Sequence, residues 1–215
     1  YILGGHTIKD SVPKYGLVVT GQVEKHNLTL NSTAKAGDVL ILTKPLGLGI
    51  ISTAIKKDEA PSALVNEAIS TMIHLNKGAA KSMNTIGVNA CTDVTGYGLL
   101  GHLLEMCQAS EVSATIEFNE TPLIQGVYEL SQKGFVPGGT KRNMNYVSSY
   151  VNFSKTISEE QKYLLADAQT SGGLLISVAK EKAEDLQKTL NKNGCLKSSI
   201  IGNVYNPAEF SIYVD

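Results

Sequence analysis

The sequence predicts a mixed α/β or α+β fold in which helices cover a sheet in layers. Short apolar runs rich in β-branched residues alternate irregularly with longer segments of helical periodicity, and two strand-like runs end the chain. The sequence contains no internal repeat and no low-complexity segment. Because strands and helices do not alternate regularly, a doubly wound parallel sheet is disfavoured.

Bulk composition limits the classes of function. The 215 residues are enough for one substantial core with a smaller appendage. The net charge of -1 and the lack of a long basic block argue against a nucleic-acid partner. The longest apolar runs, such as residues 39–42, are too short to span a bilayer, so we expect no membrane partner. Cys91, Cys107 and Cys195 form no metal or disulfide pattern, so we expect buried thiols in a cytoplasmic protein.

The first residues predict a domain boundary. Residue 1 is Tyr, and the first strand candidate, residues 15–21, begins more than a dozen residues later, which we interpret as part of a longer chain. Residues 24–35 are polar and without clear periodicity, as in a connector. We therefore predict a boundary near Ala34, with residues 1–34 and 35–215 in separate domains.

The elements of the first half follow from periodicity. Residues 39–43 form a continuous apolar strand that we expect to be buried on both faces, and Pro45 ends it before a helix at 50–57. One long helix is predicted from Ser62 to about residue 83, because apolar residues recur at helical spacing. A second apolar stripe predicts a helix at 99–107, with His102 off its apolar face.

In the second half of the chain, most segments give a clear secondary-structure prediction and one does not. Residues 112–118 alternate as a half-buried strand, and a helix is predicted from Pro122 to Gly134. Residues 136–143 indicate a turn-rich loop, and residues 144–156 give no clear signal. The remaining predictions are a capping box at Ser158 and Gln161, a strand at 174–178, a helix at 180–193, and strands at 200–204 and 210–214.

Four glycine-rich polar turns are the candidate sites, because none of the standard phosphate-loop, dinucleotide, zinc-protease or hydrolase motifs occurs. Successive backbone N–H groups in such turns form anion-binding concavities, and Lys141 and Arg142 add positive charge suited to phosphate. His6 alone is typical of a loop histidine. The turns span residues 4–7, 93–98, 137–143 and 167–173.

Asp93 has two interpretations. It lies between a strand and a helix, beside Thr92 and Thr95, where a carboxylate suits a hard cation bound through oxygen. The local pattern alone favours the other interpretation, a helix N-cap or an Asx turn. Asp167 is a candidate second carboxylate, and Lys44 is expected to be a solvated lysine at a strand end unless it contacts a ligand.

Five motifs, taken in order, closely resemble the selenophosphate synthetase (selenide, water dikinase) family over essentially the whole chain. More widely, the chain is similar to the superfamily of aminoimidazole ribonucleotide synthetase, thiamine-monophosphate kinase and a hydrogenase maturation factor. The ribonucleotide synthetase typically has Glu where this chain has His6, and Ala168 departs from the proline that the family commonly has. The motifs are Gly4-Gly5-His6-Thr7-Ile8, Thr43-Lys44-Pro45-Leu46-Gly47, residues 92–102, residues 136–143 and Gln169-Thr170-Ser171-Gly172-Gly173.

The resemblance implies an activity, cofactors and site residues. It implies that ATP and selenide give selenophosphate, AMP and orthophosphate with Mg²⁺, in a homodimer whose carboxy-terminal domain is a sheet covered by helices. Asp93 matches a magnesium ligand, and Gly4, Gly5 and His6 match a segment that contacts ATP. The family's reactive Cys or selenocysteine and its catalytic Lys precede the matched part, so we expect residues 1–34 to be the tail of an ATP-binding domain.

Two alternatives stay open from the sequence. The chain also fits another ATP-dependent member of the superfamily that acts on a different acceptor, such as a ribonucleotide synthetase or a thiamine-monophosphate kinase. A non-catalytic nucleotide-binding module is the other possibility. Because the matched catalytic residues are absent, we expect residues 1–215 alone to be inactive. No role is assigned to Asp167, Lys141 or Arg142.

Overall fold

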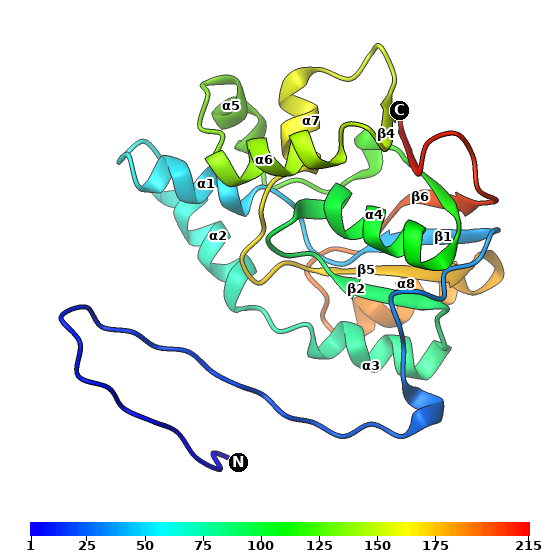
Figure 1. The fold of residues 1–215 in the computed structure, drawn as a ribbon, viewed down its shortest axis with the longest axis horizontal. Helices are drawn as coiled ribbons and strands as arrows, with labels where there is room; N and C mark the ends of the chain where they lie inside the picture. The colour runs from blue at the N-terminus through cyan, green and yellow to red at the C-terminus, as the bar shows by residue number, and fades with distance from the viewer.

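The computed structural model describes residues 1–215 and contains a seven-stranded sheet with helices on both faces (Figure 1). The spatial order of the strands is β2-β5-β1-β6-β3-β7-β4. Strand β7 is parallel to β3 and β4, and all other pairs are antiparallel. This mixed sheet confirms the predicted fold class. The strands are β1 (Asp38–Leu42), β2 (Ala90–Asp93), β3 (Ser113–Ile116), β4 (Val151–Phe153), β5 (Leu174–Ala179), β6 (Ser199–Tyr205) and β7 (Ile212–Val214).

Eight α-helices and three short 3₁₀ turns complete the structure. None of the helices is both long and apolar enough to cross a membrane. The helices are α1 (Leu48–Ile55), α2 (Ser62–Ile73), α3 (Lys77–Ile86), α4 (Gly98–Ser110), α5 (Val127–Gln132), α6 (Gly138–Val147), α7 (Glu159–Leu165) and α8 (Ala183–Lys192), and the 3₁₀ turns are η1 (Lys25–Asn27), η2 (Phe118–Glu120) and η3 (Lys180–Lys182).

Strand β1 divides the interior into two cores, because successive side chains of a strand point to opposite faces. Leu40 and Leu42 enter the larger core, to which α1, α4 and α7 contribute. Val39 and Ile41 enter a smaller core that lies under α3 and α8. All four side chains are buried, so the prediction of a strand buried on both faces is confirmed.

The prediction of one helix from Ser62 to residue 83 is wrong. Helix α2 ends at Ile73, His74 is extended at ψ 122°, and α3 begins at Lys77. The side chains of Ile69 and Ile73 are exposed, whereas Thr71 is buried. The prediction rested on apolar periodicity alone, which continues across residues 74–76 although the helix ends there.

The predicted loop at 136–143 is also wrong from Gly138 onward. Helix α6 begins there, directly after Pro137, and the unassigned region beyond it holds the end of α6 and strand β4. Two adjacent glycines disfavour a helix, but the buried side chains of Thr140 and Asn143 make hydrogen bonds that hold this one in place. Helix α5 begins at Val127, five residues later than predicted.

Residues 1–28 lie away from the body of sheet and helices (Figure 1). The strand predicted at 15–21 does not form, since this segment has no partner strand to complete its hydrogen bonds. Its apolar side chains, including Leu17, Val18 and Val19, are almost fully exposed. The first contacts with the sheet come at Leu30, whose carbonyl accepts a bond from Cys91 N at 3.0 Å.

The predicted capping box at Ser158 is confirmed. Ser158 Oγ accepts from Gln161 N at 3.3 Å, and Ser158 N donates to Gln161 Oε1 at 2.7 Å. Ser158→Ala should therefore lower the free energy of unfolding by about 1 kcal/mol, measured by urea denaturation of residues 1–215. Ser70→Ala, at an exposed helical position with no such bond, is the matched control; equal effects would contradict the capping role.

Candidate functional site

Backbone hydrogen bonds bring the loop after Asp93 against the turn at 167–173. Val94 N donates to the carbonyl of Gly173 at 2.8 Å, and Gln169 N donates to the carbonyl of Thr95 at 2.9 Å. Helix α6 joins them, since Asn143 Nδ2 donates to the carbonyl of Gly96 at 2.8 Å. Three of the four glycine-rich turns predicted from the sequence therefore meet at one place, next to strand β2.

The turn after β1 joins the same assembly through Gln169. Its side-chain Oε1 accepts from Gly47 N at 3.2 Å and from Leu48 N at 3.3 Å. Gln169 is buried, and these bonds link the start of α1 to the turn. The motif around Lys44, Pro45 and Gly47 is thus part of the scaffold of the site.

Two glycines serve close contacts within the chain. A Cβ atom on Gly172 would lie 2.0 Å from the carbonyl oxygen of Val94. A Cβ atom on Gly98 would lie 2.5 Å from the carbonyl oxygen of Ala166, and Gly98 also has a φ of +70°. Any side chain at either position would push the loops apart.

Asp93 is the last residue of β2, where it is paired with Leu174 of β5. Its side chain is exposed and takes part in no hydrogen bond or ion pair. Helix α4 begins at Gly98 with Tyr97 as its N-cap and has no side-chain cap. The alternative interpretation of Asp93 as a helix N-cap is therefore wrong, and its carboxylate oxygens are free to accept a cation.

A polar contact that the sequence did not reveal lies beside Asp93. The hydroxyl of Thr95 and Nε2 of His102 are 3.1 Å apart, and the ring of Tyr97 meets the ring of His102 edge-on at 5.8 Å. His102 is buried, and burial lowers its pKa, although the nearby charges of Asp93 and Glu105 act in the opposite direction. The seven-residue spacing across the helix start gave no signal of this contact.

Asp167 is buried and cannot serve as an open second metal ligand. Its carboxylate accepts four hydrogen bonds, from Gly49 N at 2.9 Å, Ile50 N at 3.2 Å, Thr140 Oγ1 at 2.8 Å and Gln169 Nε2 at 3.1 Å. Burial raises its pKa to about 6, while these bonds partly offset the shift. Asp167 therefore ties the first turns of α1 and α6 to the turn at 167–173.

Lys44 is also buried, with 1% of its surface exposed, so the expected solvated lysine is wrong. Lys141 and Arg142, by contrast, lie on the exposed side of the first turns of α6. Their charges are free, but no contact links them to Asp93. Burial raises the pKa of Cys91 and Cys107 to about 12, so neither thiol is a thiolate at neutral pH.

The donor set at Asp93 fits a shared magnesium ion but not a complete site. No group of three His, Cys, Asp or Glu side chains in residues 1–215 is arranged to hold a metal. Mg²⁺, however, is commonly bound by one or two carboxylates, with waters and phosphate oxygens filling the other positions. An unpaired exposed carboxylate suits that arrangement as one of several ligands.

The sequence of this chain matches the model of a known protein family. The model of the AIR synthase related protein, C-terminal domain, matches residues 35–215. The chain belongs to this family. Among solved structures, it is similar to thiamine-monophosphate kinase from Stenotrophomonas maltophilia K279a, with a TM-score of 0.65, 15% identity, and coverage of 91% of this chain and 55% of the other. It is also similar to the hydrogenase maturation protein HypE in complex with ATP, with a TM-score of 0.58, 16% identity, and coverage of 88% and 48%.

Among curated proteins, the chain is similar in sequence to selenide, water dikinases. This similarity confirms the resemblance seen in the motifs. It is 51% identical to the enzyme of Caldanaerobacter subterraneus subsp. tengcongensis, covering 99% of this chain and 62% of the relative. It is 47% identical to that of Clostridioides difficile strain 630, covering 99% and 61%. The chain thus spans about three fifths of the length of these relatives.

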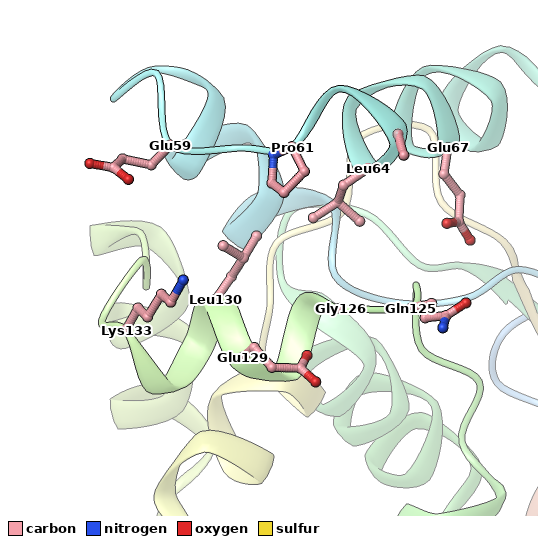
Figure 2. Close-up of a pocket in the computed structure, with 10 residues that line it drawn as sticks. Glu59, Pro61, Leu64, Glu67, Gln125, Gly126, Glu129, Leu130 and Lys133 are labelled. Atoms are coloured by element: carbon pink, nitrogen blue, oxygen red, sulfur yellow. The ribbon is translucent and has the colours of Figure 1, made fainter.

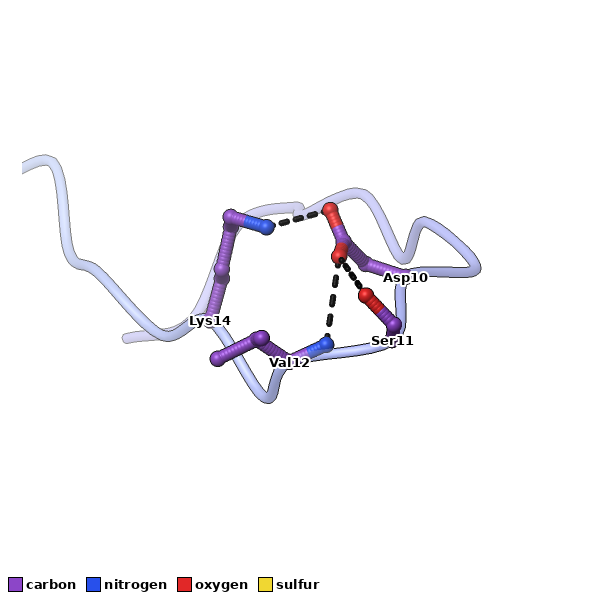
Figure 3. Close-up of polar contacts among 4 residues, drawn as sticks. All are labelled: Asp10, Ser11, Val12 and Lys14. Carbon is purple, nitrogen blue, oxygen red and sulfur yellow. Dashed lines mark hydrogen bonds and ion pairs between the residues drawn. The ribbon is translucent and has the colours of Figure 1, made fainter.

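The first motif of this family member does not lie near Asp93 in the structure. Gly4, Gly5 and His6 belong to the exposed segment before the sheet, and they line a hollow formed only by residues between Ile2 and Leu17. Beside this hollow, Asp10 accepts bonds from Ser11, Val12 and Lys14 in a small closed turn (Figure 3). The structure therefore leaves the predicted ATP contact separate from the predicted magnesium ligand.

A different hollow, with a volume of about 380 Å³, lies between α2 and α5 (Figure 2). Pro61, Leu64 and Leu130 give it apolar lining, and Glu67 of α2 and Glu129 of α5 lie on opposite sides of it. None of the five motifs contributes a lining residue. This hollow is consequently not part of the candidate site at Asp93.

Proposed function

We propose that the chain is the carboxy-terminal part of an ATP- and magnesium-dependent enzyme that makes selenophosphate from selenide, with AMP and orthophosphate as the other products. The identities of 51% and 47% with selenide, water dikinases over 99% of the chain carry this proposal. The similarity of its fold to a HypE–ATP complex supports ATP as the substrate. His6, in place of the glutamate typical of the ribonucleotide synthetase, favours selenide over that acceptor.

In this proposal Asp93 is one ligand of the magnesium ion. When bound there, Mg²⁺ would supply positive charge that stabilises the phosphates during phosphoryl transfer. Asp93 would hold the ion at the end of β2 through a carboxylate oxygen that accepts no hydrogen bond from the protein. The turn at 167–173 and helix α6 hold the backbone that follows Asp93, so they set the position of the residue at the end of β2.

Residues 1–34 are proposed to be the tail of the ATP-binding domain, and residues 35–215 the carboxy-terminal domain. Exposed apolar side chains between residues 1 and 30 support this division, because an isolated segment of this kind needs a partner to bury it. Gly4, Gly5 and His6 would then contact ATP in the complete protein. That protein is proposed to be a cytoplasmic homodimer.

The full-length protein containing this chain should convert ATP, selenide and water, with Mg²⁺, into selenophosphate, AMP and orthophosphate in equal amounts. Residues 1–215 alone are proposed to form none of them, because the resemblance implies that the catalytic residues of the family precede the matched part. Phosphorus NMR of both samples, with a sample lacking selenide as control, measures all three products. ADP as the sole nucleotide product would overturn the proposal and favour another kinase of the superfamily. Selenophosphate formed by residues 1–215 would refute the predicted inactivity.

A further inference from the structure

Lys44 lies in a closed shell of backbone carbonyl groups. Its ammonium donates to the carbonyls of Thr71 at 3.0 Å, His74 at 2.6 Å and Ser171 at 2.7 Å. An ammonium has three donors, so all of them are used. No carboxylate pairs with it, and burial lowers its pKa. Lys44 therefore joins the end of α2 to the turn at 167–173 by its charge and its donors, without an ion pair.

Ser171, whose carbonyl accepts a hydrogen bond from Lys44, has a strained backbone. Ser171 has a φ of +54°, in the left-handed region that is unfavourable for residues other than glycine, and its side chain is exposed. Such a conformation persists only where surrounding contacts determine it, and it is concentrated at functional sites. Here those contacts are the bond from Lys44 to its carbonyl and the bond from Asn76 Nδ2 to the next carbonyl, at Gly172, at 2.9 Å.

The strained turn in turn holds the backbone after Asp93. Gly173 accepts from Val94 N, and Gln169 donates to the carbonyl of Thr95, so the turn is bonded on both sides of Ser171. The backbone of Gly172 also lies so close to Val94 that a Cβ atom would not fit between them. Ser171 is thus held in the same turn that bonds the two residues after Asp93, Val94 and Thr95.

We propose that Lys44 is a positioning residue, whose ammonium fixes Ser171 in its left-handed conformation and thereby fixes the position of the backbone that carries Asp93. The link from Lys44 to the turn stands on the hydrogen bonds alone. Its consequence for magnesium rests on the proposed function of Asp93. A role in filling core volume would instead be served by any side chain of similar size.

Two substitutions and their combination separate these roles. Lys44→Met keeps the volume and removes the three donors, while Ser171→Gly removes the backbone strain that the donors hold. In residues 1–215, Lys44→Met should speed amide hydrogen exchange at Val94 and Gln169 at least about tenfold more than in the β1–β5 ladder. Adding Ser171→Gly to Lys44→Met should slow exchange at these two amides again by about tenfold, since glycine adopts this φ without penalty.

The control is Lys182→Met, which removes an exposed lysine whose bond to Gly87 is 3.4 Å long and should leave both amides unchanged. If Lys44→Met fails to fold, recovery of folding by Ser171→Gly gives the same support. The positioning role is overturned if the effects of the two substitutions on exchange simply add. It is also overturned if the double variant exchanges at Val94 and Gln169 as fast as Lys44→Met.

The consequence for magnesium is tested in the full-length protein. Lys44→Met should raise the Mg²⁺ concentration for half-maximal activity about tenfold, in line with the loss of a residue that orients a metal ligand, and Ser171→Gly should reverse it. Exchange rescue with an unchanged Mg²⁺ dependence would keep Lys44 as the holder of the turn and overturn its link to magnesium. If the full-length protein makes no selenophosphate, the proposed function fails while the exchange result still stands.

Discussion

Asp93→Asn in the full-length protein is expected to lower the rate of selenophosphate formation by on the order of 100-fold or more, because a bound metal ion contributes several kcal/mol to stabilising the transition state. The substitution keeps the size of the side chain and removes only its charge. Since the side chain of Asp93 is exposed and makes no hydrogen bond, the fold and the free energy of unfolding should not change. Turnover and urea denaturation measured on the same preparation separate the two effects.

Glu181→Gln is the matched control for Asp93→Asn. Glu181 is an exposed carboxylate in the 3₁₀ turn η3, and it lies in no motif and no ion pair. It should retain full turnover at every Mg²⁺ concentration. If Asp93→Asn also retains full turnover at limiting Mg²⁺, then Asp93 is not a ligand of the catalytic ion.

The second large effect is on stability. Asp167→Ala should lower the free energy of unfolding of residues 1–215 by about 3–5 kcal/mol, because four buried donors lose their acceptor together. Urea denaturation measures the loss, with Glu181→Ala as the exposed control. A loss below 1 kcal/mol would mean that water satisfies these donors and that Asp167 does not tie the loops together.

The pH dependence of stability tests the same carboxyl group. Burial raises the pKa of Asp167 from 3.8 to about 6 in the folded state, so its contribution to stability is greatest below pH 3.8 and is lost as the pH rises through 6. Relative to Asp167→Asn, the unsubstituted chain should lose up to about 3 kcal/mol across this window. A gain in relative stability over the same window would show that the four donors outweigh burial.

Local signals were enough to predict several elements from the sequence. The apolar run at 39–42 predicted β1 because a strand in the middle of a covered sheet is apolar on both faces. The capping box at Ser158 was predicted because both of its bonds lie within four residues. Asp93 was singled out from its place between a strand and a helix, and the structure leaves its carboxylate free.

Long-range contacts account for what the sequence did not reveal. Nothing near Lys44 indicates that carbonyls 27 to 127 residues away surround its ammonium. Asp167 was only a candidate second carboxylate with no role assigned, and three of its four donors come from α1 and α6, far away along the chain. The strand predicted at 15–21 had the right composition, but a strand forms only beside a partner.

Binding of Mn²⁺ to the full-length protein in the presence of ATP is the most direct test of Asp93 as a metal ligand. Electron paramagnetic resonance measures free Mn²⁺, so the affinity can be compared between the unsubstituted protein, Asp93→Asn and Glu181→Gln. Asp93→Asn should weaken the binding of at least one ion by about tenfold or more, while Glu181→Gln should leave it unchanged. Equal affinities in all three proteins would contradict the assignment of Asp93 to the metal site.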